Sequence, residues 1–240
     1  MVEEREDADV ETSSEGYAHR FEGPVGRFFL QRQAEATLDL LRPFPAASIL
    51  DVGGGHGQLT GPLVEAGYAV TVLGSDASCE ARLREWTAAG RARFVSGDLL
   101  AAPLPDRSFD VVLSYRLLPH VRRWPELVAT LARLACRAVI VDYPTRRSVN
   151  AAADLLFGLK KGVEGNTRPF TVFSDAEIAA AFAGRGFAPT GRRPQFFFPM
   201  ALHRGLRSAG VARSLEGPAA FLGLTRSFGS PVILRLERRG

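Results

Sequence analysis

Short apolar runs alternate with helix-like stretches through the middle of the chain. Five runs have the length and composition of buried strands: residues 48–52, 69–73, 92–96, 109–114 and 138–142. Three stretches between them repeat apolar positions at helical spacing: residues 58–66, 78–89 and 125–134. This alternation predicts right-handed β-α-β units and a parallel sheet, with a ligand site at the carboxyl ends of the strands.

The N-terminal part has a different pattern. Residues 1–14 are polar and acidic without periodicity, which predicts a disordered tail. Residues 17–41 return to helical spacing, and Gly23-Pro24 divides them into a short helix and a longer one. We therefore expect an N-terminal helical cap over residues 15–45.

The alternation also ends after Pro144. Residues 148–160 predict an amphipathic helix, and Ser174 with Glu177 forms a capping box that opens a helix to about residue 183. The remainder predicts shorter pieces: the start of a strand at residues 186–190, an aromatic segment at 195–198, a helical stretch at 200–209 and a last strand at 231–238. The last strand alternates apolar and polar residues, which favours an antiparallel position near the sheet edge.

Together these elements predict an α/β fold. We expect a Rossmann-like, doubly wound, mostly parallel sheet of about seven strands, with an antiparallel last strand and helices on both faces. No repeat or second boundary is present, so residues 15–240 are interpreted as one domain. Its parts are the cap at 15–45, a core at 46–145, an insertion at 146–174 and C-terminal helices and strands at 175–240.

Composition narrows the class of protein. The chain has 240 residues, no run long enough to span a membrane, and an acidic N-terminus unlike a secretory leader, so we expect a cytoplasmic protein. Two cysteines and four scattered histidines do not have the spacing of a metal site. The net charge of +4 comes almost entirely from arginine, without a recognisable RNA-binding motif, which disfavours nucleic acid as a partner.

The first strand ends in a glycine-rich turn that begins Asp51-Val52-Gly53 and continues through Gly55 and Gly57. A dinucleotide site requires a third glycine where this chain has Gln58, and a P-loop requires a lysine that is absent. Glycine main chain lets a ligand lie directly against the backbone, so the turn still indicates a cofactor site. His56, between the glycines, is expected to point outward and is given no catalytic role.

The pattern Asp-x-Gly-x-Gly-x-Gly resembles the first motif of the class I S-adenosylmethionine-dependent methyltransferases. Three further segments are similar to that family and extend the resemblance over residues 46–142: residues 93–99, 103–112 and 114–121. The resemblance implies S-adenosylmethionine as cofactor. Asp51 would hold its ammonium group, and Gly53, Gly55 and Gly57 would lie under its methionine half. Asp98 and Leu99 would meet the adenine, with Ser114 beside the cofactor after the fourth strand.

One position departs from the family. The resemblance places an acid that holds the ribose at the end of the second strand, where this chain has Gly74. Asp76, two residues later, is the predicted replacement, although Ser75 with water, or weak ribose recognition, remains an alternative.

The implied reaction is in-line displacement of the sulfonium methyl group by an acceptor that the protein aligns and desolvates. His120 is the candidate general base for a hydroxyl acceptor, and Tyr115 and Arg116 are candidates for contact with the substrate. Arginine and aromatic residues in the C-terminal part favour an apolar small molecule that carries a carboxylate or phosphate. An RNA methyltransferase and a binding protein that has lost the activity remain alternatives, and the oligomeric state stays open.

Overall fold

Strands dominate the centre of the protein. In a computed structural model that describes residues 6–149 and 170–240, seven strands form one sheet in the order β3-β2-β1-β4-β5-β7-β6. Their bounds are β1 (Ser48–Val52), β2 (Ala69–Gly74), β3 (Ala92–Ser96), β4 (Phe109–Ser114), β5 (Ala135–Tyr143), β6 (Phe187–Phe196) and β7 (Ser230–Arg238). The predicted mostly parallel α/β sheet is confirmed.

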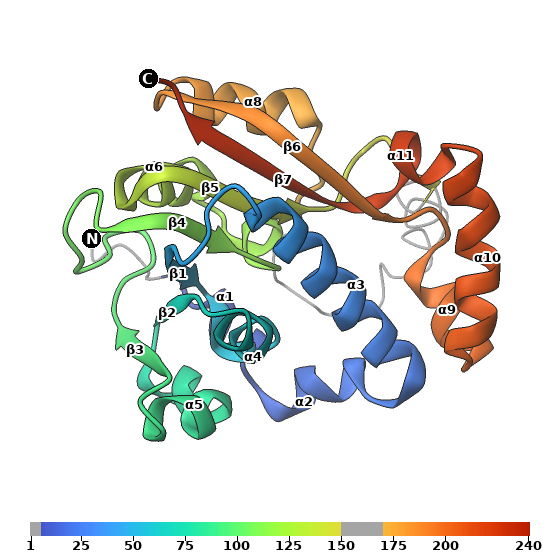
Figure 1. The fold of residues 1–240 in the computed structure, drawn as a ribbon, viewed down its shortest axis with the longest axis horizontal. Coiled ribbons are helices and arrows are strands. Elements are labelled where there is room, and N and C mark those ends of the chain that lie inside the picture. The colour runs from blue at the N-terminus through green and yellow to red at the C-terminus, as the bar shows by residue number, and fades with distance from the viewer. Residues whose placement is uncertain (1–5, 150–169) are drawn as a thin grey trace.

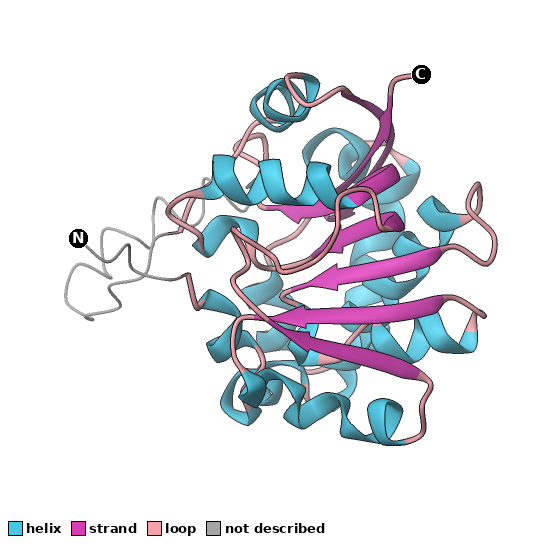
Figure 2. Cartoon of the chain, turned by 90° about the vertical axis from the view of Figure 1, so that its left-hand side faces the viewer, coloured by secondary structure: helices cyan, strands magenta, loops and turns pink. Residues whose placement is uncertain are grey.

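The first five strands are parallel, and their carboxyl ends meet at one edge (Figure 2). Strand β1 lies between β2 and β4 because it is apolar toward both faces. Ile49 joins the hydrophobic cluster on one face and Leu50 the cluster on the other, and both are fully buried. The bounds of β1, β3 and β4 agree with the prediction, whereas β5 begins three residues earlier than predicted.

The last two strands are antiparallel, as predicted for β7, which lies between β5 and β6. The expectation of two separate pieces around residues 186–198 was wrong, because β6 runs continuously through Pro189 and Pro194. Proline has no N–H to donate, and an edge strand tolerates it because one side of its backbone has no neighbouring strand. The sequence showed the prolines but not that this strand would lie at the edge.

Helices cover both faces of the sheet (Figure 1). Helices α3 (Gly23–Leu41) and α4 (Thr60–Glu65) pack on one face, and α6 (Trp124–Leu134) and α8 (Asp175–Ala183) pack on the other. The capping box at the start of α8 is present as predicted.

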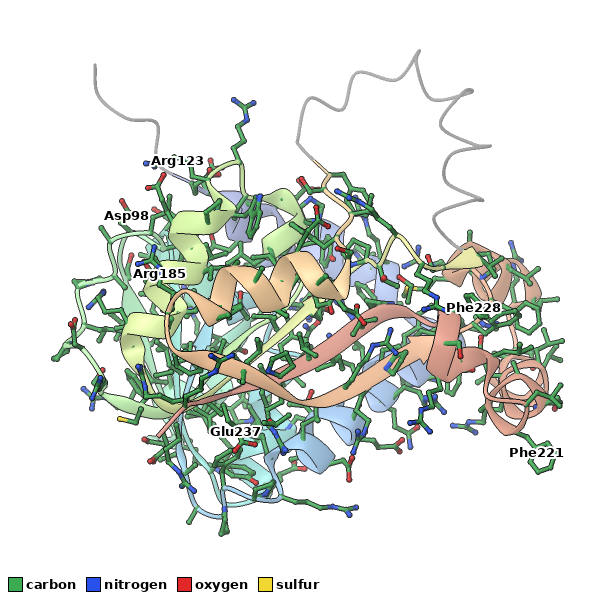
Figure 3. The ribbon with its side chains drawn as sticks, turned by 90° about the horizontal axis from the view of Figure 1, so that it is seen from above. Asp98, Arg123, Arg185, Phe221, Phe228 and Glu237 are labelled. Atoms are coloured by element: carbon green, nitrogen blue, oxygen red, sulfur yellow. The ribbon has the colours of Figure 1, made fainter. Side chains whose placement is uncertain are left out.

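The fold has further helices: α2 (Glu15–Ala18), the 3-10 helix η3 (Ala77–Leu83), α5 (Arg84–Ala88), α9 (Met200–Leu206), α10 (Ala209–Phe221) and α11 (Leu224–Phe228). Helix α10 places Phe221 at the opposite end of the molecule from Asp98 (Figure 3).

The N-terminal segment differs from the expectation. Residues Ala8–Thr12 form a helix, α1, in which Ala8 and Asp9 are buried, so the predicted disordered tail was wrong for this stretch. Residues 1–5 lie outside the described part of the chain, as does nearly all of the predicted helix at 148–160. Over the described residues, none of the helices has both the length and the apolar content needed to span a bilayer.

Candidate functional site

The glycine turn after β1 brings bare main chain to the carboxyl edge of the sheet. Gly53 and Gly57 have φ angles of 76° and 74°, a left-handed conformation that side chains disfavour. A Cβ atom on Gly54 would lie 2.2 Å from Oδ2 of Asp51, so the turn closes directly over that carboxylate. The sequence pattern therefore has a steric basis in the folded protein.

Asp51 is buried beneath the turn, with 2% of its surface exposed. Its Oδ1 has no hydrogen-bond partner among the described residues. Burial, and secondarily the charge of Asp142, raise the pKa of Asp51 to about 7. A cationic group at this position would satisfy the free oxygen and favour the ionised form, so the donor set fits an ammonium group.

At the end of β2, Gly74 leaves no room for a side chain. A Cβ atom there would lie 2.7 Å from Cβ of Cys79 and 2.9 Å from the ring of Phe94. Asp76, the predicted replacement for the missing acid, is exposed, and its Oδ1 accepts a hydrogen bond from the Ser78 amide at 2.8 Å. The carboxylate that does lie buried here comes from Asp9, whose Oδ2 accepts from the Ser75 amide at 2.7 Å.

The residues after β3 and β4 line the same edge. Oδ1 of Asp98 accepts from the Leu100 amide at 2.8 Å, and Leu99 is fully buried in the apolar cluster. Ser114 is also buried, and its hydroxyl donates to the Val52 carbonyl at 3.3 Å. These three residues thus lie at the carboxyl edge of the sheet, the edge at which the glycine turn also lies, as the parallel order of the strands predicted.

A cavity of about 440 Å³ opens at the carboxyl ends of β4 and β5, where Arg116 and Asp142 line it. Aromatic rings form much of its wall, among them Phe21, Phe29 and Phe196. Its polar groups include those of Gln33, Arg116, His120, Asp142 and Arg204. A larger depression of about 930 Å³ beside β6 and α11 contains none of the motif residues.

Arg116 adopts a φ angle of 56°, which is unfavourable for a residue with a side chain. The turn is held by Asp142, whose Oδ1 accepts from the Arg116 amide at 2.6 Å. The guanidinium lies 3.9 Å above the centroid of Phe21, and its Nη2 donates to Gln33 at 3.2 Å. Nη1 is buried with no partner among the described residues. This leaves one unsatisfied cationic donor in a largely aromatic surrounding.

The other two residues predicted for the acceptor side, His120 and Tyr115, lie in different surroundings. His120 lines the cavity, with its ring 5.6 Å from that of Phe170. Tyr115, predicted to contact substrate, does not line it. Its hydroxyl is buried and shares a 2.7 Å hydrogen bond with Thr37 of α3, and the side chain packs in the apolar cluster between α3 and the sheet.

His56 also contradicts its prediction, since it is buried rather than outward-facing. Its ring lies edge-on to Tyr17 and Phe21 at 5.6 and 5.5 Å. Burial, followed by the charges of Arg116 and Arg82, lowers the pKa of His56 to about 4. A neutral, enclosed imidazole of this kind packs against the aromatic wall and does not exchange protons near neutral pH.

Sequence reasoning assigned no role to Asp142, Gln33 or Asp9. Asp142 carried a usable signal, because it is the acid at the end of a predicted parallel strand. Burial raises the pKa of the Asp142 carboxyl, whereas the hydrogen bond from the Arg116 amide lowers it. Burial has the larger effect, so the pKa is raised to about 6. Gln33 and Asp9 reach the site from N-terminal helices and carried no local signal.

Comparison with known proteins gives a consistent result. A family model described as a methyltransferase domain matches residues 50–138. The chain is 33% identical over 185 residues to a ubiquinone biosynthesis O-methyltransferase of Caulobacter vibrioides, covering 70% of this chain and 71% of that protein. It is 36% identical over 151 residues to the protein of the same name from Paramagnetospirillum magneticum, covering 58% of each. The match therefore spans little more than half the length of the latter relative.

Solved structures show the same fold. A magnesium protoporphyrin IX methyltransferase from Synechocystis with bound S-adenosylhomocysteine superposes with a TM-score of 0.65 at 18% identity, over 95% of this chain and 96% of that one. A possible histamine N-methyltransferase from Thermotoga maritima gives 0.67 at 18% identity, over 96% and 99%. At this identity the likeness concerns the fold alone.

Proposed function

The chain belongs to the class I S-adenosylmethionine-dependent methyltransferases, and on this premise we propose that it methylates a small aromatic acceptor carrying an anionic group. The observation that supports the acceptor is the aromatic cavity with Nη1 of Arg116, which has no hydrogen-bond partner within residues 6–149 and 170–240. An acceptor carboxylate or phosphate would satisfy this donor, which is costly to leave buried and unpaired.

The cofactor side of the site supports the same proposal. Asp51, with its free Oδ1, would hold the ammonium group, and the main chain of Gly53 and Gly55 would pack against the methionine half. Asp98 and Leu99 would meet the adenine. The bound cofactor supplies an activated methyl group, so the protein's own task is to align the acceptor and exclude water.

His120 is the group at the cavity wall that would take a proton from an acceptor hydroxyl. Oxygen is the atom named in the two similar ubiquinone biosynthesis O-methyltransferases. Asp142 also lines the cavity, but the Arg116 amide occupies its Oδ1 and the Gln33 amide approaches its Oδ2 at 3.5 Å. We therefore assign the base to His120 and the orientation of Arg116 to Asp142.

The test measures methyl transfer from radiolabelled S-adenosylmethionine to matched acceptors: hydroxylated aromatic acids, their methyl esters and bulk tRNA. We expect transfer to the acids and at least a tenfold loss of kcat/KM for the esters, the order expected for one lost charge-assisted hydrogen bond. Arg116→Met should remove this discrimination. Arg185→Met serves as a control, because Arg185 does not line the cavity. Equal transfer to acids and esters, or transfer only to tRNA, would contradict the proposal.

A further inference from the structure

Helix α1 lies buried at the carboxyl edge of the sheet, where the cofactor is proposed to bind. Asp9 is completely buried, and Ala8, Thr12 and Ser13 are each less than a tenth exposed. The helix contacts both the glycine turn and η3, the 3-10 helix after β2. Such burial is unusual for an acidic N-terminal segment, so the contacts of individual residues decide what the helix does there.

The region between the glycine turn and η3, which α1 fills, is called the crevice below. Ala8 lies in its apolar part. It belongs to the same buried cluster as Leu73, Leu99 and Leu117. Leu99 is the residue proposed to meet the adenine ring. Ala8 therefore adds a buried methyl group to the apolar cluster that also contains the residue proposed to meet the adenine.

Asp9 occupies the position next to the end of β2. Its Oδ2 accepts from the Ser75 amide at 2.7 Å and lies 3.5 Å from Sγ of Cys79. Burial raises the pKa of the Cys79 thiol, and the neighbouring Asp9 carboxylate adds to this effect. The other oxygen of Asp9 is buried without a partner among the described residues, as is Oγ of Ser75. The carboxylate anchors α1 to the crevice through a single strong hydrogen bond.

Ser13 covers the glycine turn itself. A Cβ atom on Gly55 would lie only 2.2 Å from Oγ of Ser13, so this side chain fills the space that the glycine leaves open. Cβ of Asp9 similarly lies 3.5 Å from the Cβ position of Gly53. The hydroxyls of Thr12 and Ser13 donate back to the Asp9 carbonyl at 3.1 and 2.7 Å. Helix α1 thus satisfies its own hydroxyl donors while it covers the bare main chain.

We infer that α1 competes with the cofactor for this crevice and must leave it before S-adenosylmethionine binds, so that the N-terminal segment is an autoinhibitory plug. This inference rests on the proposed function, because it assigns the cofactor to the surface that α1 covers. Helix α1 has five residues and no side-chain hydrogen bond at its N-cap, so its structure depends on docking. The apparent affinity for the cofactor is reduced by the fraction of molecules in which the plug is undocked.

The first experiment weakens the anchor in the full-length protein. Asp9→Ala removes the acceptor for the Ser75 amide, and titration calorimetry with S-adenosylhomocysteine should show a Kd about tenfold lower than in the wild type, the order expected for one charged hydrogen bond. Asp7→Ala is the matched control, because Asp7 is exposed and makes no cap bond. Circular dichroism confirms that each variant is folded. A Kd that stays unchanged or rises for Asp9→Ala would overturn the inference, and a rise would make Asp9 a cofactor ligand instead.

The second experiment fixes α1 in its docked position with a disulfide bond. Asp9→Cys, in a Cys136→Ser background, places a thiol beside Cys79, and oxidation should join the two and abolish S-adenosylhomocysteine binding until a reductant is added. Asp9→Ser in the same background cannot form the bond and should bind under both conditions. Full binding by the oxidised, disulfide-containing protein would refute the plug. If the wild type binds S-adenosylhomocysteine and no variant changes the affinity, the plug is refuted but the proposed function is not. If no variant binds at millimolar ligand, both the plug and the proposed function are refuted.

Discussion

Gly74 offers the sharpest test of the packing at the cofactor edge. The family resemblance suggests that Gly74→Asp would restore a missing ribose acid, but the structure predicts a less stable protein with no gain in affinity. A Cβ atom would lie 2.7 Å from Cβ of Cys79 and 2.9 Å from two ring carbons of Phe94. Ordinary contacts are about 3.5–4 Å, so η3 or the ring must move by several tenths of an ångström.

The size of the effect follows from two opposing contributions. Overpacking of a buried site costs about 1–3 kcal/mol, and replacing glycine returns about 0.4–1 kcal/mol through the unfolded chain. Gly74→Ala should therefore lower the free energy of unfolding by about 1–2 kcal/mol. In a domain of this size that corresponds to a fall in Tm of about 3–6 °C. Gly74→Asp should lose more, because its carboxylate must also be accommodated in the buried site.

Thermal unfolding followed by circular dichroism measures this, with Gly217→Ala as the matched control. Gly217 lies within α10 with no atom near its Cβ position, so its replacement should raise Tm. Phe94→Leu should recover part of the loss when combined with Gly74→Ala, because it shortens one of the two opposing groups. The reasoning is refuted if Gly74→Asp unfolds at the wild-type temperature and binds S-adenosylhomocysteine more tightly.

Three further predictions concern the ionisable groups Asp51, Glu216 and His120. The pKa of Asp51 is about 7 in the folded protein and near 3.8 when unfolded, so the free energy of unfolding should fall from pH 4 to 7. Asp51→Asn should remove part of that fall, as measured by urea titrations at pH 4.5 and 7.5. Glu216 accepts from the amides of residues 197 and 198 and from His203, so Glu216→Ala should cost about 3 kcal/mol in chemical denaturation, whereas Glu65→Ala, at an exposed position of α4, should cost far less. His120→Gln should lower kcat for a hydroxyl acceptor by about 10²-fold with little change in KM, and a loss below twofold would exclude it as the base.

The strands and the glycine turn could be predicted from local patterns alone. Short apolar runs bounded by turn residues set the limits of β1, β3 and β4, because the centre of each run is rich in residues that favour a strand. The parallel order then placed Asp51, Asp98 and Ser114 at one edge of the sheet. Ser174 and Glu177 identified the start of α8, because a capping box involves only neighbouring residues.

The sequence by itself thus determined the fold class and the edge of the sheet at which the motif residues Asp51, Asp98 and Ser114 gather. Only the tertiary structure decided which side chains face the acceptor cavity, and it replaced Tyr115 with Asp142 and Gln33 beside Arg116. It also brought Asp9 to Ser75, 66 residues along the chain, and showed that Gly74 is required by Cys79 and Phe94. Contacts of this kind depend on the packing of distant segments, so the local pattern of an acidic N-terminus does not predict them.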